Sequence, residues 1–383
     1  MKQKMISFMK EIEKDIRSLS NYLYTNFETS YNETNSSKYI QNLMEKYEFN
    51  VSCNYLGIEN SFIASKGSGH PKICYLCEYD AIENLGHITG HNILTSISVS
   101  ASLILGNIID EIGGSVILIG CPGEYLGGTK YILLKQGAFD DIDAVMECHP
   151  SYDTAQSGTS YAIIPLSIKY FGHSSLAFLN QNRYSALDAL LLTINSIESL
   201  TKTFPNNSYI NYVISNGGQS PIIIPEKTEL KLYIRSKSYL IAEKIQKQIE
   251  DLCNNISNLT KIDNKISMYE TPNKELKTNV TLNRLFNHNL KECGIIHINP
   301  PKNVNAGLSI GAISNYVPTI HPYISIIDNT MIKYGTRDFA DYTQSSFAFS
   351  QLQKSALALA YTGSDLILKP SLLNEVKNYF YSN

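Results

Sequence analysis

Short apolar strands alternate with polar loops and helices between residues 60 and 147, and this alternation limits the possible folds more than any other feature. Strands that alternate with helices in this way are typical of a parallel sheet covered by helices on both faces. The sequence therefore predicts a three-layer α/β domain, preceded by helices over 1–27 and 36–48, the second with Ser36 or Ser37 as N-cap. We predict the strands near 60–65, 72–79, 115–120 and 143–147, and the helices between them over 93–109 and 127–136.

The pattern changes after residue 163 and indicates a small inserted domain. The α/β pattern then resumes with the strand NKISMYE, a helix near 280–292 and a terminal helix over 341–362. We therefore expect an α/β domain formed by 1–163 and 259–383, interrupted by a unit at 164–258. Within that unit we predict strands over 163–171 and 228–236 and helices over 183–200 and 238–256.

The composition argues against several classes of function. The net charge of −3 gives no reason to expect nucleic acid or a membrane surface as a partner. No run of eighteen apolar residues occurs, and the N-terminal segment lacks the apolar core of a signal peptide. Seven cysteines without regular spacing favour a reducing cytoplasm, and we interpret Cys74 and Cys77, a CxxC within a predicted strand, as buried thiols.

Polar stretches follow four apolar segments, at the points where chemistry collects in an α/β sheet. Asp80, the 83–92 loop, Glu124 and His149 fall at such strand ends, which predicts one shared site. Imidazoles and carboxylates can bind a zinc ion at about 2.0–2.2 Å, and a glutamate that does not bind the ion can take a proton from water. Structural explanations stay open: Glu124 can cap a helix beginning near Gly127, and loop histidines commonly bond to backbone. The stretches are CEYDAIENLGHITGHN (77–92), GCPGEYLGGTK (120–130), DAVMECHP (143–150) and YVPTIHP (316–322).

In this order and spacing, the four stretches resemble those of the zinc aminoacylase and carboxypeptidase family. They are most similar to its aminobenzoyl-glutamate and dipeptide amidohydrolases, in which Gly-His-Ala-Cys-Gly-His-Asn is followed by Pro-Ala-Glu-Glu and His-Pro. The likeness covers nearly the whole chain and includes NGGQSPIIIPEKTELKLYIRS and YVPTIHPYISI. It implies a zinc-peptidase-like catalytic domain interrupted by an α+β, ferredoxin-like lid domain that commonly dimerises. A homodimer and an amino-acid-like small-molecule substrate follow as expectations.

At the site itself the chain departs from the family pattern. Glu124 matches the family's general base, and His91 and His149 match metal ligands. Tyr125 stands where the family has a glutamate ligand, and Thr89 stands where it has a bridging cysteine. The last family ligand would fall at Gly335, which has no side chain. By this comparison both anionic ligands are lost, so we expect no dinuclear zinc site and, as cofactor, either none or a single zinc ion.

The resemblance also assigns residues for substrate binding. Leu176 and Ile222 replace a lid histidine and a lid asparagine of the family, which predicts a preference for an uncharged or hydrophobic group. Arg235 matches an arginine that meets a substrate carboxylate, although an ion pair that supports the fold explains it equally well. His321, in TIHP, either lines the pocket floor or makes a structural hydrogen bond.

Three hypotheses about function follow. The first is a metal-free or metal-poor enzyme acting on an amide or peptide-like molecule, with Glu124 as general acid or base, Tyr125 as a donor to the oxyanion, and Asp80 beside them. The second is a hydrolase that keeps one metal ion, to which Cys121 or Cys148 could add a thiolate. The third is an inactive pseudo-hydrolase that binds or scaffolds. An isolated buried carboxylate at Glu124 would favour the enzymes, because burying an unpaired charge is costly.

Overall fold

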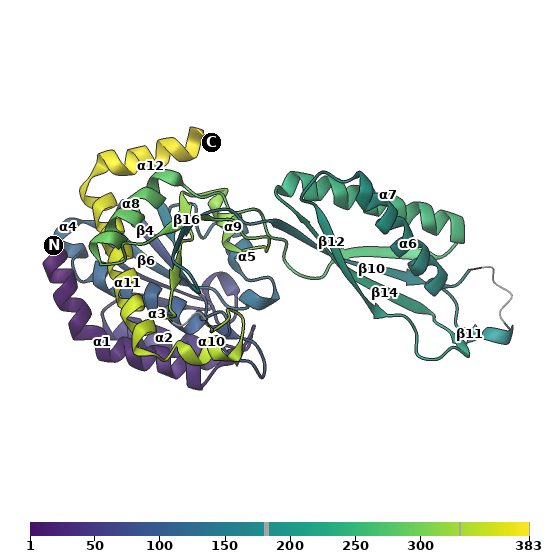
Figure 1. Ribbon diagram of the computed structural model, residues 1–383, viewed down its shortest axis with the longest axis horizontal. Helices are drawn as coiled ribbons and strands as arrows, with labels where there is room; N and C mark the ends of the chain where they lie inside the picture. The colour runs from purple at the N-terminus through teal and green to yellow at the C-terminus, as the bar shows by residue number, and fades with distance from the viewer. Residues whose placement is uncertain (180–183, 329–330, 383) are drawn as a thin grey trace. The chain divides into compact units, whose positions relative to one another are not determined.

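The computed structural model describes residues 1–179, 184–328 and 331–382. The chain forms two compact units, coloured along the sequence in Figure 1. Unit 1 consists of Met1–Thr159, Leu276–Val304 and Ala312–Asn383. Unit 2 consists of Ser160–Glu275 and Asn305–Gly311, so an inserted segment forms a body of its own.

A six-stranded sheet forms the centre of unit 1. The four strands β17, β7, β4 and β6 are mutually parallel, as the sequence predicts, whereas β3 and β2 pair in antiparallel fashion. The prediction of an all-parallel sheet is therefore wrong at this edge. The connection from β3 to β4 is too short for a parallel crossover, which needs a dozen or more residues. In spatial order the strands are β17 (Thr319–Ile320), β7 (Ala144–Met146), β4 (Lys72–Cys77), β6 (Gly114–Gly120), β3 (Phe62–Ser68) and β2 (Asn50–Cys53).

Smaller β elements complete unit 1. A second sheet has the order β16 (Asn299–Lys302), β9 (Ala155–Ser157), β18 (Tyr323–Ser325) and β8 (His149–Ser151). The short strands β1 (Glu28–Thr29) and β5 (Asp80–Ala81) pair in parallel. Because β5 and β8 follow β4 and β7 closely, both continue the chain at the carboxyl end of the main sheet.

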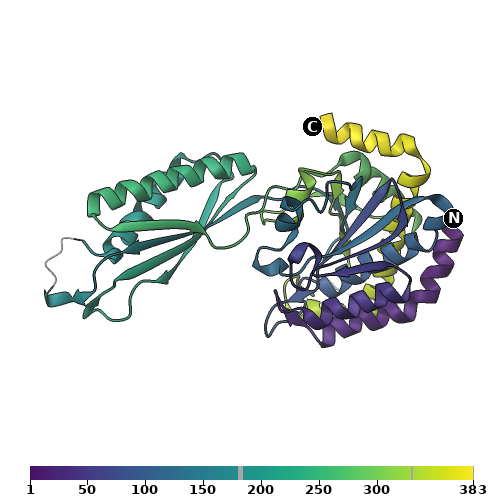
Figure 2. The same ribbon diagram turned by 180° about the vertical axis from the view of Figure 1, so that it is seen from behind.

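Helix α3 (His91–Gly106) is buried along its whole length and contacts β4, β6, α1 and α11. The hydroxyls of Ser96, Ser100 and Ser102 donate to backbone carbonyls one turn back, which satisfies these polar groups inside the core. Helix α1 lies on the outside of unit 1 in both views (Figure 1 and Figure 2). The other α-helices of unit 1 are α1 (Lys2–Thr25), α2 (Thr34–Lys46), α4 (Ile109–Ile112), α5 (Lys130–Lys135), α8 (Val280–Glu292), α10 (Arg337–Tyr342), α11 (Ser346–Leu368) and α12 (Pro370–Ser382). The short helix α9 (Ile310–Ser314) begins in the last segment of unit 2 and ends in unit 1.

Two helix starts differ from the sequence prediction. The N-cap prediction at Ser36 or Ser37 is wrong, because the carboxylate of Glu28 accepts from the backbone N–H of Asn35 and of Ser36 at the start of α2. The helix predicted over 127–136 begins only at Lys130, after the 3-10 turn η2 (Glu124–Leu126). Gly127 and Gly128 have φ of 92° and 69°, a left-handed backbone that cannot belong to a helix.

Unit 2 consists of an antiparallel sheet and two helices that pack against it, and the strands and helices share one apolar core. The sheet order is β12 (Tyr209–Asn216), β14 (Lys227–Ser236), β10 (Ala162–Phe171) and β15 (Asp263–Met268). The helices are α6 (Ala186–Leu200) and α7 (Tyr239–Thr260), and β11 (Ser175–Leu176) pairs with β13 (Ile223–Ile224). The predicted start of the first helix at residue 183 lies outside the described residues. The strand NKISMYE, which we expected in the first domain, pairs with β10 instead, so unit 2 extends beyond 258.

No helix within residues 1–179, 184–328 and 331–382 is both long and apolar enough to cross a membrane.

Candidate active site

Polar side chains gather where the parallel strands of unit 1 end. Glu78 directly follows β4, Glu147 directly follows β7, and His321 directly follows β17. Glu124 lies in the 3-10 turn after β6. Because the carboxyl ends of neighbouring parallel strands share one edge of the sheet, these residues from distant parts of the chain converge.

Lys130, the first residue of α5, lies at the centre of this cluster and has no exposed surface. Its Nζ forms an ion pair with Glu78, lies 3.2 Å from Glu124 Oε2 and lies 3.4 Å from Glu147 Oε1. Burial would lower the pKa of the ammonium group, but the three carboxylates outweigh burial and raise it well above its ordinary value. Glu124 is therefore not the isolated carboxylate that we expected, because a buried lysine pairs with it.

The pKa values of Glu78 and Glu147, the buried glutamates that follow β4 and β7, differ. Burial disfavours the carboxylate of Glu78, but the charges of Lys130 and His91 outweigh this effect and lower its pKa to about 2. Burial and the nearby charge of Glu78 raise the pKa of Glu147 well above its ordinary value. Neither carboxyl oxygen of Glu147 has a hydrogen-bond partner among the described residues. Within the cluster, the pKa values of these two neighbouring glutamates thus shift in opposite directions.

Asp80 fixes the orientation of His91, the first residue of α3. His91 Nδ1 lies 2.9 Å from Asp80 Oδ1, and its Nε2 lies 3.2 Å from Glu78 Oε2. Burial would lower the pKa of His91, but the hydrogen bond to Asp80 and the charge of Glu78 raise it to about 9. The other oxygen of Asp80 accepts from Ser30 Oγ at 2.6 Å and from the backbone N–H of Tyr125 at 2.9 Å. Since groups of this chain occupy both oxygens, Asp80 is suited to positioning rather than to contact with a substrate.

His149 and His321 complete the cluster as neutral imidazoles. His149 Nδ1 donates to the carbonyl of Pro150 at 2.7 Å, and its ring lies 5.9 Å from that of His91 and 5.4 Å from that of His321. Burial lowers the pKa of His149 to about 4 and that of His321 to about 3. By contrast, His87 lies in the core with Nε2 3.0 Å from the carbonyl of Leu23, which is the structural role considered for a loop histidine.

One atom each from Glu78, His91 and His149 could bind the same metal ion. These atoms lie within 4.8 Å of one another and are buried. Because Nδ1 of each histidine faces another partner, Nε2 is the atom available to an ion. Two histidines and a glutamate are a known ligand set for catalytic zinc with open positions. The family comparison kept only His91 and His149 as ligands, and it overlooked Glu78, which the structure places beside them.

Three positions at which the family has metal ligands carry no carboxylate, imidazole or thiol in this chain. The hydroxyl groups of Thr89 and Tyr125, which replace two family ligands, are hydrogen-bonded to each other. The ring of Tyr125 stacks on that of His91, with centroids 4.6 Å apart and planes at 21°. Gly335 has φ of 79° and offers no side chain. At these three positions the chain therefore offers no charged ligand for a second ion.

Neither cysteine considered as a shifted ligand belongs to a group of side chains in the described part of the chain that could hold a metal ion. Cys148 is buried in the main apolar core of unit 1, and burial raises the pKa of its thiol. Cys121 is also fully buried, and burial raises the pKa of its thiol well above the ordinary value. A neutral thiol is a poor metal ligand.

The cluster is built from unit 1 alone, and the other predicted site residues belong to unit 2. Arg235 lies on β14, and its buried Nε has no hydrogen-bond partner in the described part of the chain. Leu176 ends β11 and Ile222 precedes β13, with 40% and 54% of their surfaces exposed. Their roles in substrate binding stay predictions.

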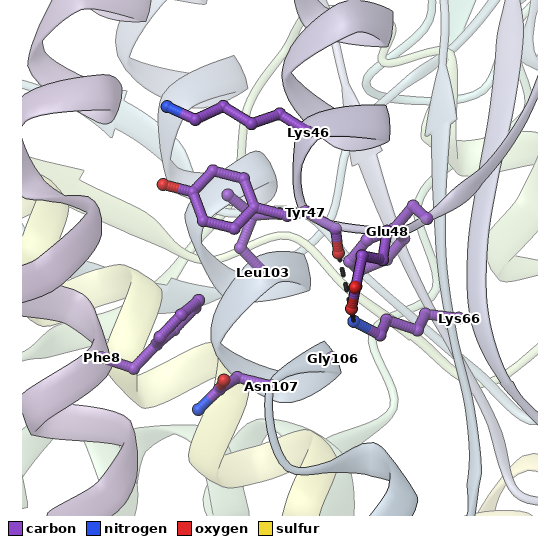
Figure 3. A pocket seen from close by; sticks show the side chains of 9 residues that line it. Phe8, Lys46, Tyr47, Glu48, Lys66, Leu103, Gly106 and Asn107 are labelled. Carbon is purple, nitrogen blue, oxygen red and sulfur yellow. Dashed lines mark hydrogen bonds and ion pairs between the residues drawn. The ribbon is translucent and has the colours of Figure 1, made fainter.

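Figure 3 shows a hollow elsewhere in unit 1, with a volume of about 250 Å³. Phe8, Tyr47, Lys66 and Leu103 are among its lining residues, and Lys66 Nζ donates to the carbonyl of Tyr47 at 3.1 Å. None of the carboxylates or histidines of the cluster lines it. This hollow is therefore not part of the candidate active site.

Comparisons with known proteins agree with the sequence resemblance. Mouse (Mus musculus) Xaa-Arg dipeptidase is 31% identical over 317 residues, which cover 81% of this chain and 73% of that protein. One subunit of the p-aminobenzoyl-glutamate hydrolase from Escherichia coli strain K12 is 28% identical over 287 residues, 68% of this chain and 60% of that protein. No family model matches the chain.

A solved structure supports the fold. The dinuclear metal-binding peptidase of the M20 family from Bacillus subtilis superposes with a TM-score of 0.67 over 93% of this chain and 99% of that one, at 14% identity. The α/β architecture with a second, inserted unit is thereby confirmed. Together with the dipeptidase relative, it leads to one assignment: the chain belongs to the zinc aminoacylase and carboxypeptidase family, as its motifs predict.

Proposed function

We propose that the protein hydrolyses an amide or peptide bond in an amino-acid-like small molecule, using one metal ion held by Glu78, His91 and His149. The observation that carries this proposal is the convergence of these three donors with Glu124 at one edge of the sheet. The relatives named above, a dipeptidase and an aminobenzoyl-glutamate hydrolase, support the reaction class. A zinc ion bound there would polarise the substrate carbonyl and lower the pKa of water.

The residues of the chain would supply proton transfer and orientation. Glu124 is the general base: it is half-buried, and its Oε2 is held by Lys130 at 3.2 Å. Asp80 holds His91 through Nδ1 and leaves Nε2 directed at Glu78. Tyr125, with its hydroxyl on Thr89, is a candidate donor to the oxygen that becomes charged.

For the substrate, we propose that unit 2 contacts an uncharged or hydrophobic group. Leu176 and Ile222 expose apolar surface in that unit, and Arg235 offers a cation for a carboxylate. A molecule with a free carboxylate and an apolar acyl or side-chain group would satisfy both features.

Replacing Glu124 by Gln tests the catalytic proposal. We expect kcat on N-acyl amino acids and dipeptides to fall by about 10²–10⁴, the usual contribution of a general base. The matched control is Glu83→Gln, an exposed glutamate of the neighbouring loop, which should leave kcat unchanged. Unchanged turnover in Glu124→Gln would refute the role of Glu124, and full turnover after metal removal would support the metal-free hypothesis instead.

We also propose that two copies of the chain form a homodimer through unit 2. The edge strand β12 exposes apolar surface at Tyr209, Val213 and Ile214, which are 48%, 59% and 43% exposed. An unpaired edge of this kind is a ready template for pairing with a second copy. Val213→Lys should yield a monomer in light scattering, whereas Leu240→Lys on α7 should not.

We further propose that the protein works in a reducing compartment. All seven cysteines are free, which suits the reducing environment of the cytoplasm.

A further inference from the structure

A lysine ammonium already sits where the carboxylates of the site converge, and this feature bears on how tightly a metal ion can bind. Lys130 pairs with Glu78, the one anionic ligand of the candidate set, and also lies near Glu124 and Glu147. A permanent cation that is bonded to a ligand carboxylate competes with a metal ion for the carboxylate oxygens, and its charge repels the metal ion. We infer that Lys130 is a positioning residue that weakens metal binding at Glu78, His91 and His149.

The backbone conformation before α5 determines where the side chain of Lys130 lies. The left-handed glycines 127 and 128 end the turn that carries Glu124, and α5 then begins with Lys130 pointing into the cluster. The residue has no exposed surface, so it cannot reach a substrate from solvent. Its effect on the reaction must therefore act through the groups that it contacts.

The charge of the cluster supports this role. Glu78 has one oxygen on Lys130 and the other 3.2 Å from His91 Nε2, so groups of the protein already contact both oxygens that an ion would use. An incoming dication must compete with these two contacts. The site would accordingly load its ion only when the free ion is abundant. This inference rests on the proposed ligand set, but it does not require turnover.

Metal titration of Lys130→Met tests the inference directly. Met has a similar length and no charge, and the titration uses Co²⁺, whose visible absorption reports its coordination by nitrogen and oxygen ligands. We expect the Kd for Co²⁺ to fall by at least tenfold relative to the unaltered chain, a change of about 1.4 kcal/mol. The matched control is Lys135→Met, an exposed lysine of the same helix, which should leave the Kd unchanged.

A second variant guards against misfolding. Lys130→Met combined with Glu147→Gln removes a buried pair together, and replacing both partners is better tolerated than removing one. It should show the same gain in affinity, and adding His91→Ala should abolish that gain. Unchanged or weaker Co²⁺ binding in the folded double variant would overturn the inference.

The result separates this inference from the proposed function. If the unaltered chain binds no ion but the lysine variants do, the role of Lys130 stands and the single-metal hydrolase fails. If no variant binds Co²⁺, the inference itself is wrong.

Discussion

Asp80→Asn should destabilise the metal-free protein strongly at neutral pH and much less at high pH. The hydrogen bond from His91 Nδ1 to Asp80 and the charge of Glu78 outweigh burial and raise the pKa of His91 from 6.5 to about 9. A rise of this size corresponds to about 3 kcal/mol of stability. Because the folded pKa lies above the unfolded one, this stability is complete below pH 6.5 and is lost as the pH rises through 9.

The amide of Asn keeps the shape of Asp80 but not its charge. We expect Asp80→Asn to remove at least half of the stabilisation that protonated His91 provides, about 2 kcal/mol at pH 6. Above pH 10 His91 is neutral in both proteins, so only the pH-independent loss of the bonds from Ser30 and Tyr125 remains. The loss of unfolding free energy caused by Asp80→Asn should therefore be larger at pH 6 than at pH 10.

The assay is urea unfolding with a chelator present at pH 6 and pH 10. Burial and the charge of Asp80 also raise the pKa of Glu33, to about 7, so the comparison is repeated in a Glu33→Gln background. Asp141→Asn, an exposed partner of His70, is the control and should change little at either pH. An equal destabilisation at pH 6 and pH 10 would refute the idea that Asp80 keeps His91 charged.

Three further predictions concern acid stability, metal number and substrate choice. Burial lowers the pKa of His321 to about 3, below its unfolded value of 6.5. The folded protein therefore loses about 3 kcal/mol of unfolding free energy between pH 6.5 and 4.5, because only the unfolded chain takes up a proton at this histidine. His321→Asn should flatten the pH dependence of the unfolding free energy over that range, and an unchanged slope would contradict this. Thr89→Cys with Tyr125→Glu restores two anionic donors and should raise the zinc content per chain in equilibrium dialysis; unaltered stoichiometry would show that other groups limit the site. Leu176→Asp should raise KM for substrates with an apolar acyl group while kcat is kept, whereas Leu191→Asp, equally exposed on α6, should do neither.

The sequence predicts much of the cluster because its residues lie directly after apolar strands. Asp80, His91, Glu124 and His149 are predicted at or near strand ends, and the structure brings them together in unit 1. The resemblance supplied their roles, since each also has a structural explanation when it is considered alone. Strand position was thus the informative signal.

Glu78, Glu147 and Lys130 were missed, although they decide the charge of the site. Each glutamate directly follows an apolar run, in KICYLCEYDA or DAVMECHP, so hydrophobic patterning assigns it to the strand rather than to a site. A signal was present, because both acids occupy the first position after a buried parallel strand. Lys130 could not be placed because the helix was predicted to begin three residues earlier, and only the left-handed glycines move its start.

The edges of the fold were also beyond the sequence pattern. The antiparallel pairing of β2 and β3 and the membership of β15 in unit 2 depend on which strands meet in space, and local periodicity carries no such information. The replacement of two family ligands by Thr89 and Tyr125 was visible in the sequence, but their hydrogen bond to each other was not.

We propose that this chain binds one metal ion, whereas the Bacillus subtilis peptidase of similar fold binds two. Crystals of the protein purified without chelator and equilibrated with zinc, measured at the zinc absorption edge, test it most directly. We predict a single anomalous peak per chain, in contact with Glu78, His91 and His149. Two peaks, or a peak that touches none of these three residues, would contradict it.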